Sequence, residues 1–361
     1  MRTYRPFTLA FGAVLILLLS GVMAFNFIVD PFQYYRKSEL YKPILWGGMQ
    51  RHQNAGLARH HAEEVIVVGS SVTENFFTKD IQASWGRPAR RLSISGSLAH
   101  EQYLVTRQAL ATGRVREVMW GADAGAFMRQ HDAVRDDQAP FPWHMYRDKP
   151  VPNVEYLLAI GTTRLSIAAL RGYGVTDFDS YHSWHAAAEY GPKVVLKGWM
   201  RSCDEFTRKY VEGARARPAA MISTMTESIE RNMVSLVRQH PGTVFHIFLP
   251  SMATLMYVPA DAGFLRSAVP FREVLARAVT GFPNVRLHDF QAVPELANDL
   301  GRYKDPLHYD LATSRYIIDA IRDGRHLVHD TAQMTAQNEA LIAMVNAYDI
   351  CRDGTLQASR Q

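Results

Sequence analysis

Three residues of the chain have the types and spacing for nucleophilic acyl transfer. Ser71 follows the apolar run 65–68 and Gly69, and Asp305 and His308 stand three positions apart near the carboxyl end. A serine hydroxyl needs a base for its proton, and a neutral imidazole suits that task near neutral pH. The imidazole needs a carboxylate that fixes its tautomer and stabilises its charged form. We therefore predict Ser71 as nucleophile, His308 as base and Asp305 as the residue that orients the base.

The same residues also have structural interpretations. Ser71-x-x-Glu74 fits a capping box, in which the hydroxyl only satisfies an amide of the following helix. Asp305-Pro306 is a common start of a surface turn. A position of His308 beside Ser71 would favour the chemical interpretation.

Strand and helix patterns alternate around these residues and predict how they are positioned. The apolar runs predict strands at 65–68, 91–95, 117–120, 243–249 and 285–289. Helical patterns stand between and after them, at 72–85, 100–112, 219–239, 271–280 and 311–323. Alternation implies parallel pairing, so the expected fold is a three-layer α/β/α sandwich with a central parallel sheet. Parallel strands end at one edge, where Ser71 and His308 can meet.

The alternation breaks between about 128 and 212. Apart from a predicted helix at 154–170, this interval is irregular and aromatic, as in 141–146 and 178–185. A long irregular insertion is usually functional or a lid, so a carbohydrate groove is one interpretation. Aromatic packing of a large loop onto the sheet is the other.

Residues 7–29 carry no charge, are mostly apolar and are long enough to span a bilayer. Arg2 and Arg5 precede them, so the amino terminus is expected in the cytoplasm. This predicts a single-pass inner (plasma) membrane protein, with its carboxyl-terminal domain in the periplasm or outside the cell. A cleaved signal peptide is the alternative, but the apolar run continues past the tolerated site at Ala24. The expected organisation is a cytoplasmic segment at 1–6, the anchor at 7–29, a juxtamembrane connection at 30–62, an α/β domain at 63–325 with the insertion, and a helical extension at 326–361.

Composition limits the partners. The net charge of +5 is spread along the chain with no basic run, so nucleic acid is not an expected partner. Cys203 and Cys351 could form one disulfide in an oxidising compartment or be two buried thiols. Their spacing argues against structural zinc, and neither a metal nor a cofactor is expected.

Four short motifs, in this order, resemble those of the SGNH hydrolase superfamily, the GDSL-type esterases. They are Gly69-Ser70-Ser71, Ser95-Gly96-Ser97, Trp120-Gly121-Ala122-Asp123 and Asp305-Pro306-Leu307-His308. The resemblance covers roughly residues 64 to 323 and implies an SGNH/flavodoxin-like fold with a Ser71–His308–Asp305 triad. It also implies an oxyanion hole built from the backbone amides of Ser71 and Gly96, with Asp123 at the position of the family's third donor.

Two residues depart from the family pattern. Ser70 replaces the usual aspartate of the first motif, and Asp123 stands where the family has an asparagine. An ionised carboxylate cannot donate a hydrogen bond and would repel a developing oxyanion.

With the anchor, the resemblance implies a serine esterase or O-acyltransferase acting on a cell-envelope or exported polysaccharide. A separate multi-pass membrane acyltransferase is the implied acyl donor. The alternative, favoured by Asp123, is a catalytically silent domain that binds polysaccharide or organises a membrane assembly.

Overall fold

The computed structural model describes residues 4–137, 139–147, 153–181, 183–196, 217–257 and 263–349. They form two compact units. The first unit contains Met1–His61 and Pro140–His182, and the second contains Ala62–Ala139 and Ser183–Gln361. Of residues 30–62, expected as a connection, those up to His61 thus belong to the same unit as Pro140–His182, and they contain helix α2 (Gln50–His60).

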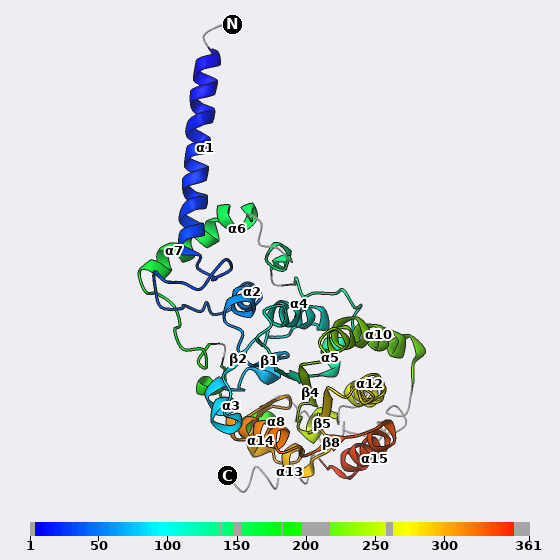
Figure 1. Ribbon diagram of the computed structural model, residues 1–361. Coiled ribbons are helices and arrows are strands. Elements are labelled where there is room, and N and C mark those ends of the chain that lie inside the picture. Colours follow the sequence, from blue (N-terminus) through cyan, green and yellow to red (C-terminus); the bar gives the residue numbers. More distant parts are fainter. Residues whose placement is uncertain are drawn as a thin grey trace. The chain divides into compact units, whose positions relative to one another are not determined.

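The second unit is a mixed α/β structure around a mostly parallel six-stranded sheet (Figure 1). Its strand order is β2-β1-β3-β4-β5-β8, and β8 alone is antiparallel to its neighbour. The bounds are β1 Val65–Val68, β2 Ala89–Arg91, β3 Glu117–Gly121, β4 Val244–Leu249, β5 Val285–Asp289 and β8 Leu327–Val328. Because β1 to β5 run in parallel, the segments that follow them meet at one edge of the sheet.

The strand predictions at 65–68, 117–120, 243–249 and 285–289 are confirmed to within one residue. The prediction at 91–95 is wrong, because β2 ends at Arg91. The next residues still donate hydrogen bonds, from Leu92 N to Val67 O and from Ile94 N to Gly69 O, before the chain turns at Gly96. The sequence did not predict β8 or the hairpin of β6 (Tyr303–Asp305) and β7 (His308–Tyr309), which are too short for a periodic pattern.

Helices cover both faces of the sheet (Figure 1). The bounds in the second unit are α3 Thr78–Trp85, α4 Ala99–Leu110, α5 Ala124–Phe127, α8 Pro192–Leu196, α10 Ala219–Ile229, α11 Ser235–Gln239, α12 Gly263–Val279, α13 Pro294–Ala297, α14 Leu311–Arg322 and α15 Thr331–Ala347. A π-helical turn at Glu230–Val234 joins α10 to α11, so the helix predicted at 219–239 is continuous. The one predicted at 72–85 is wrong at its start, where Ser71–Thr73 is a 3-10 turn and α3 follows only at Thr78.

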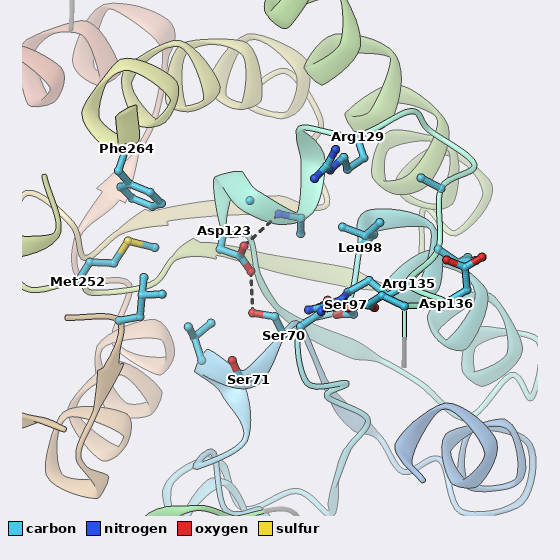
Figure 2. A pocket seen from close by; sticks show the side chains of 18 residues that line it. Ser70, Ser71, Ser97, Leu98, Asp123, Arg129, Arg135, Asp136, Met252 and Phe264 are labelled. Carbon is cyan, nitrogen blue, oxygen red and sulfur yellow. Dashed lines mark hydrogen bonds and ion pairs between the residues drawn. The ribbon is translucent and has the colours of Figure 1, made fainter. Parts of the chain in front are cut away.

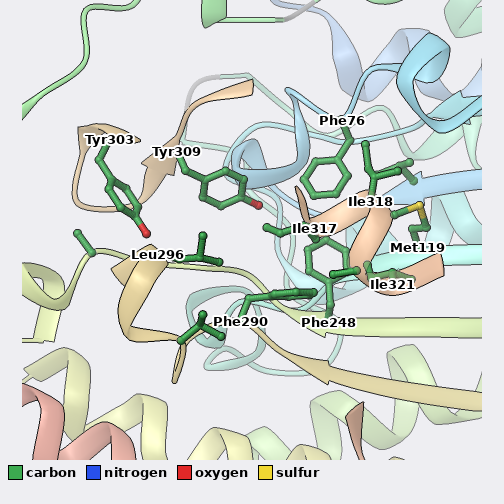
Figure 3. Packing of buried hydrophobic residues seen from close by; sticks show 14 of the residues in the cluster. Phe76, Met119, Phe248, Phe290, Leu296, Tyr303, Tyr309, Ile317, Ile318 and Ile321 are labelled. Carbon is green, nitrogen blue, oxygen red and sulfur yellow. The ribbon is translucent and has the colours of Figure 1, made fainter. Parts of the chain in front are cut away.

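An apolar cluster on one face of the sheet extends beneath the β6–β7 hairpin (Figure 3). Met119, Phe248 and Phe290 come from strands or their ends, and Ile317 from α14 packs against them. Tyr303 and Tyr309 of the hairpin belong to the same cluster and are almost fully buried. Their burial fixes the hairpin on the core, although it has few backbone pairs of its own.

The ion pair of Arg272 in α12 with Asp289 at the end of β5 is fully buried. Arg272 Nη1 and Nη2 donate to the two Asp289 oxygens over 2.8 and 2.6 Å, and its Nε donates to Asn338 of α15. Arg272→Ala would leave a buried, uncompensated carboxylate, so we expect the free energy of unfolding to fall by about 3–5 kcal/mol. Denaturant unfolding measures this. As the control, Arg272→Met with Asp289→Leu removes both charges and should recover much of the loss. A free energy of unfolding of Arg272→Ala within about 0.5 kcal/mol of the wild-type value would contradict the stabilising role of this ion pair.

In the first unit, helix α1 (Tyr4–Val29) is the one described helix that is long and apolar enough to cross a membrane. The helix predicted at 154–170 is two helices, α6 (Val154–Leu158) and α7 (Ile160–Leu170), since Ala159 has extended backbone angles. Both pack against α1. After α1 the chain turns at Asp30, whose carboxylate accepts from the backbone N–H groups of Tyr34, Tyr35 and Arg36.

Candidate active site

Ser71 is positioned by a sharp turn directly after β1. Gly69 has φ 152°, and a Cβ at this position would lie 2.8 Å from a side-chain carbon of Thr73 and 3.1 Å from the carbonyl oxygen of Gly121. Only glycine therefore fits, because the backbone here passes close to β3. Ser71 then begins the 3-10 turn, with its side chain free of any capping bond. The capping-box interpretation with Glu74 is wrong, because no α-helix begins at Ser71.

The short β6–β7 hairpin presents Asp305 and His308. The two residues are paired across it, and Asp305 Oδ1 accepts hydrogen bonds from the backbone N–H groups of Leu307 and His308, each over 3.0 Å. The expected turn at Asp305-Pro306 is therefore present, and the aspartate itself closes it. Its carboxylate is held on the same side as the following imidazole.

The structure brings Ser71, His308 and Asp305 into one hydrogen-bonded chain. Ser71 Oγ lies 2.8 Å from His308 Nε2, and His308 Nδ1 lies 2.8 Å from each oxygen of Asp305. If Nδ1 donates its proton to Asp305, Nε2 is left as an acceptor for the Ser71 hydroxyl. This is the tautomer that a general base for serine requires.

The environment of Asp305 favours its ionised form. Partial burial raises its pKa, but the hydrogen bond and charge of His308 and the two backbone N–H donors lower it by more, so that the net shift is downward. Asp305 is consequently a carboxylate near neutral pH, and it can stabilise an imidazolium that forms beside it.

Trp184 supports the triad from the side, although sequence reasoning gave it no individual role. Its ring meets the His308 ring edge-on at 5.2 Å, and its Nε1–H donates to the carbonyl oxygen of Ser71 over 3.3 Å. Lys304 Nζ lies over the Trp184 ring, 4.5 Å from its centroid. One side chain thus contacts both the base and the backbone of the nucleophile. The only signal in the sequence was its place in the aromatic interval, which many packing residues share.

A cavity of about 670 Å³ opens beside Ser71 at the carboxyl edge of the sheet. The connection after β1 leads to β2 on one side, whereas the connection after β3 leads to β4 on the other side, and ligands commonly bind at such a reversal. Ser71 follows β1 and Asp123 follows β3, so the cavity lies at this point. In Figure 2, Met252 and Phe264 lie on one side of Asp123, while Arg129 and Arg135 lie on the other. The cavity therefore has an apolar end and a charged end.

Gly96 forms part of the cavity wall with a left-handed backbone at φ 58°. A Cβ there would collide with the guanidinium of Arg135, so the close approach of Arg135 depends on glycine. Within the described chain, the backbone N–H groups of Ser71 and Gly96 make no hydrogen bond, so both remain possible donors for an oxyanion.

Asp123 also lines the cavity, but its two oxygens are occupied. Oδ1 accepts from the backbone N–H of Ala126 and caps α5, and Oδ2 accepts from Ser70 Oγ over 2.7 Å (Figure 2). Burial raises the pKa of Asp123 in spite of these hydrogen bonds. The two departures from the family pattern are thus partners: the serine hydroxyl at 70 donates to the carboxylate at 123.

The aromatic interval contributes to the cavity differently than expected. Of residues 128–212, those that line it are Arg129 and Ala133 to Asp137, and none is aromatic. Arg135 is held by Asp137 in a bidentate pair with distances of 3.0 and 2.6 Å. An aromatic groove for a sugar is therefore absent from this cavity as far as the described residues define it.

Among the described residues, no group of three or more His, Cys, Asp or Glu side chains could hold a metal ion. Cys203 and Cys351, for which a disulfide and two buried thiols were the alternatives, lie outside the described residues.

Comparison with known proteins adds no relative: no protein-family model, no curated protein and no solved structure matches this chain.

Proposed function

We propose that the chain is a membrane-anchored serine esterase or O-acyltransferase of the SGNH type, which removes or transfers an acetyl group on a cell-envelope or exported polysaccharide. The observation that carries the proposal is the Ser71–His308–Asp305 chain of hydrogen bonds, at the edge of a parallel sheet and beside a cavity. The nucleophile after the first strand and the base in a hairpin before α14 also follow the order of motifs on which the resemblance rests.

The chemistry follows from the geometry. His308 Nε2 takes the Ser71 proton as Oγ attacks the acyl carbon, and the imidazolium is stabilised by Asp305. The N–H groups of Ser71 and Gly96 would donate to the tetrahedral oxyanion. When the bond to the leaving alcohol breaks, His308 returns the proton to its oxygen. Water or a sugar hydroxyl then resolves the acyl-enzyme, which distinguishes the esterase from the transferase.

The apolar helix α1 supports the anchor, and Arg2 and Arg5, which precede the uncharged run 7–29, support a cytoplasmic amino terminus with the second unit in the periplasm or outside the cell. On that side of the membrane no cytoplasmic acyl donor is present. We therefore include in the proposal a multi-pass membrane acyltransferase as the partner that hands over the acyl group.

A second candidate function is a catalytically silent domain that binds polysaccharide or organises a membrane assembly. It is favoured by Asp123, because an ionised carboxylate in the cavity wall opposes a developing oxyanion.

Covalent capture separates the two candidates. The full chain in detergent is mixed with an activated acetyl ester, quenched, digested and analysed by mass spectrometry. The enzyme should carry one acetyl group on Ser71, and adding an acetyl-accepting oligosaccharide should discharge it. Absence of any acetylated Ser71, in a protein that still binds the oligosaccharide, would favour the silent domain.

A further inference from the structure

Helix α7 in the first unit has an apolar face with no protein partner among the described residues. Its small residues Thr162, Ser166 and Ala169 recur at helical spacing and are buried. The opposite side presents Ile160 and Ile167, which are 72% and 41% exposed. Leu170, also next to this side, is 51% exposed. A helix at a water-exposed surface normally packs such apolar residues against the protein interior, so we expect an apolar environment around this face.

The buried side of α7 is fixed to the carboxyl-terminal end of α1. Asn26, fully buried, donates through Nδ2 to the carbonyl oxygen of Leu157 and to Thr163 Oγ1, each over 2.8 Å. Its Oδ1 accepts from Ser166 Oγ over 2.9 Å. Figure 1 shows α6 and α7 crossing this end of α1. The height of Asn26 along α1 therefore sets the height of α7.

That height corresponds to the boundary of a bilayer. The helical segment from Phe7 to Asn26 rises by about 30 Å, the thickness of a hydrocarbon core. Just beyond it, the guanidinium of Arg36 donates to the carbonyls of Phe27 and Ile28 and lies 4.5 Å from the centre of the Phe27 ring. A cation at the end of an apolar span is typical of the headgroup layer.

The composition of the exposed face also fits that layer. Arg164 and Arg171 stand among the exposed apolar residues, neither has an ion-pair partner among the described residues, and α7 contains no acidic residue. Tyr173, just after the helix, is 64% exposed. Apolar side chains flanked by arginine and tyrosine are the pattern of helices that lie in a membrane interface.

We propose that α7 lies in the outer interface of the membrane that α1 spans, with Ile160, Ile167 and Leu170 at the level of the upper acyl chains and Arg164 and Arg171 against anionic phosphate groups. The inference rests on the membrane anchor within the proposed function, but not on the chemistry of Ser71. Helix α7 in this position holds the first unit at a defined depth in the membrane.

The test uses the full chain, one copy per nanodisc, in phosphatidylcholine with phosphatidylglycerol. Cys203→Ser and Cys351→Ser remove the native thiols, and Ile167→Cys carries an environment-sensitive fluorophore. Leu17→Cys, in the middle of α1, is the matched control. We expect a lipid quencher placed near the headgroups to reduce emission most strongly at position 167. A quencher deep in the acyl chains should act most strongly at position 17.

The outcomes separate the inference from the anchor. Quenching at 17 without quenching at 167 overturns the interfacial helix and leaves the anchor intact, while absence of quenching at both positions overturns both. A probe at 167 that becomes shielded only when two copies share a nanodisc would identify a second copy as the occupant and overturn the lipid assignment. Arg164→Glu with Arg171→Glu should weaken quenching at 167 in anionic discs, and an unchanged signal would overturn the role of the arginines.

Amide hydrogen exchange of the unlabelled wild type provides a measurement without cysteine changes. Residues 160–170 should exchange more slowly in nanodiscs than in detergent. Their exchange should slow further when phosphatidylglycerol replaces phosphatidylcholine in the nanodiscs. Equal exchange in neutral and anionic discs would contradict contact with anionic headgroups.

Discussion

Ser71→Ala should abolish acyl transfer while leaving the protein folded. Ser71 Oγ is the atom that His308 Nε2 contacts over 2.8 Å, and the substitution removes the attacking oxygen. Loss of the nucleophile in a serine triad lowers turnover by roughly 10⁴–10⁶-fold. The side chain caps no helix, so the free energy of unfolding should change by only about 1 kcal/mol, the worth of one hydrogen bond. Hydrolysis of a small acetyl ester and the melting temperature, followed in parallel, check both parts.

Ser70→Ala is the matched control, because it removes the neighbouring hydroxyl and leaves the triad complete. Ser70 donates to Asp123, so this variant should retain covalent capture on Ser71. Equal turnover in wild type and Ser71→Ala would reject the nucleophile, as would a loss of activity that follows unfolding. Larger damage from Ser70→Ala than from Ser71→Ala would move the nucleophile to the adjacent serine.

The parts of the fold that were predictable from sequence are those whose burial dictates residue type. Val65 to Val68 form a strand buried on both faces, and the β-branched run follows directly from that environment. The β6–β7 hairpin carries no such pattern, because packing of Tyr303 and Tyr309 on the core holds it instead of length or periodicity. A tertiary contact between distant segments leaves no trace in local spacing.

The candidate site shows the same division. Ser71, Asp305 and His308 could be selected because chemistry demands those residue types in some order along the chain. Trp184 could not be selected, since any aromatic residue of the interval 141–185 has the same local signature and only the fold sets one against His308. The pairing of Ser70 with Asp123 was equally hidden: two departures from a family pattern, 53 positions apart, are one hydrogen bond in space.

The stability of Asp123→Asn should differ from that of the wild type in a pH-dependent way. The pKa of Asp123 is raised in the folded state by burial. The protonated carboxyl therefore contributes stability that is fully present below the pKa of Asp123 in the unfolded chain. This stability is lost as the pH rises through the pKa of Asp123 in the folded protein. Asparagine does not ionise and keeps the cap on Ala126 through its side-chain oxygen. Its melting temperature should therefore exceed that of the wild type near pH 7, and the difference should shrink as the pH falls toward 4.

The same substitution should accelerate acyl transfer. In the wild type, Ser70 Oγ donates to Asp123 Oδ2. An asparagine nitrogen in the position of Oδ2 would donate to Ser70 Oγ instead, so that the Ser70 hydroxyl could donate its proton to another acceptor in the cavity. The negative charge beside the oxyanion is removed at the same time. One additional donor is worth on the order of 10²-fold in turnover, so Asp123→Asn should raise kcat by up to about that factor, with little change in KM.

Asp123→Ala, which removes the charge without supplying a donor, is the control and should gain less. A lower kcat in Asp123→Asn, in a protein that melts no earlier than the wild type, would show that the carboxylate contributes to the reaction. The oxyanion would then lie away from Asp123, within reach of the Ser71 and Gly96 amides alone.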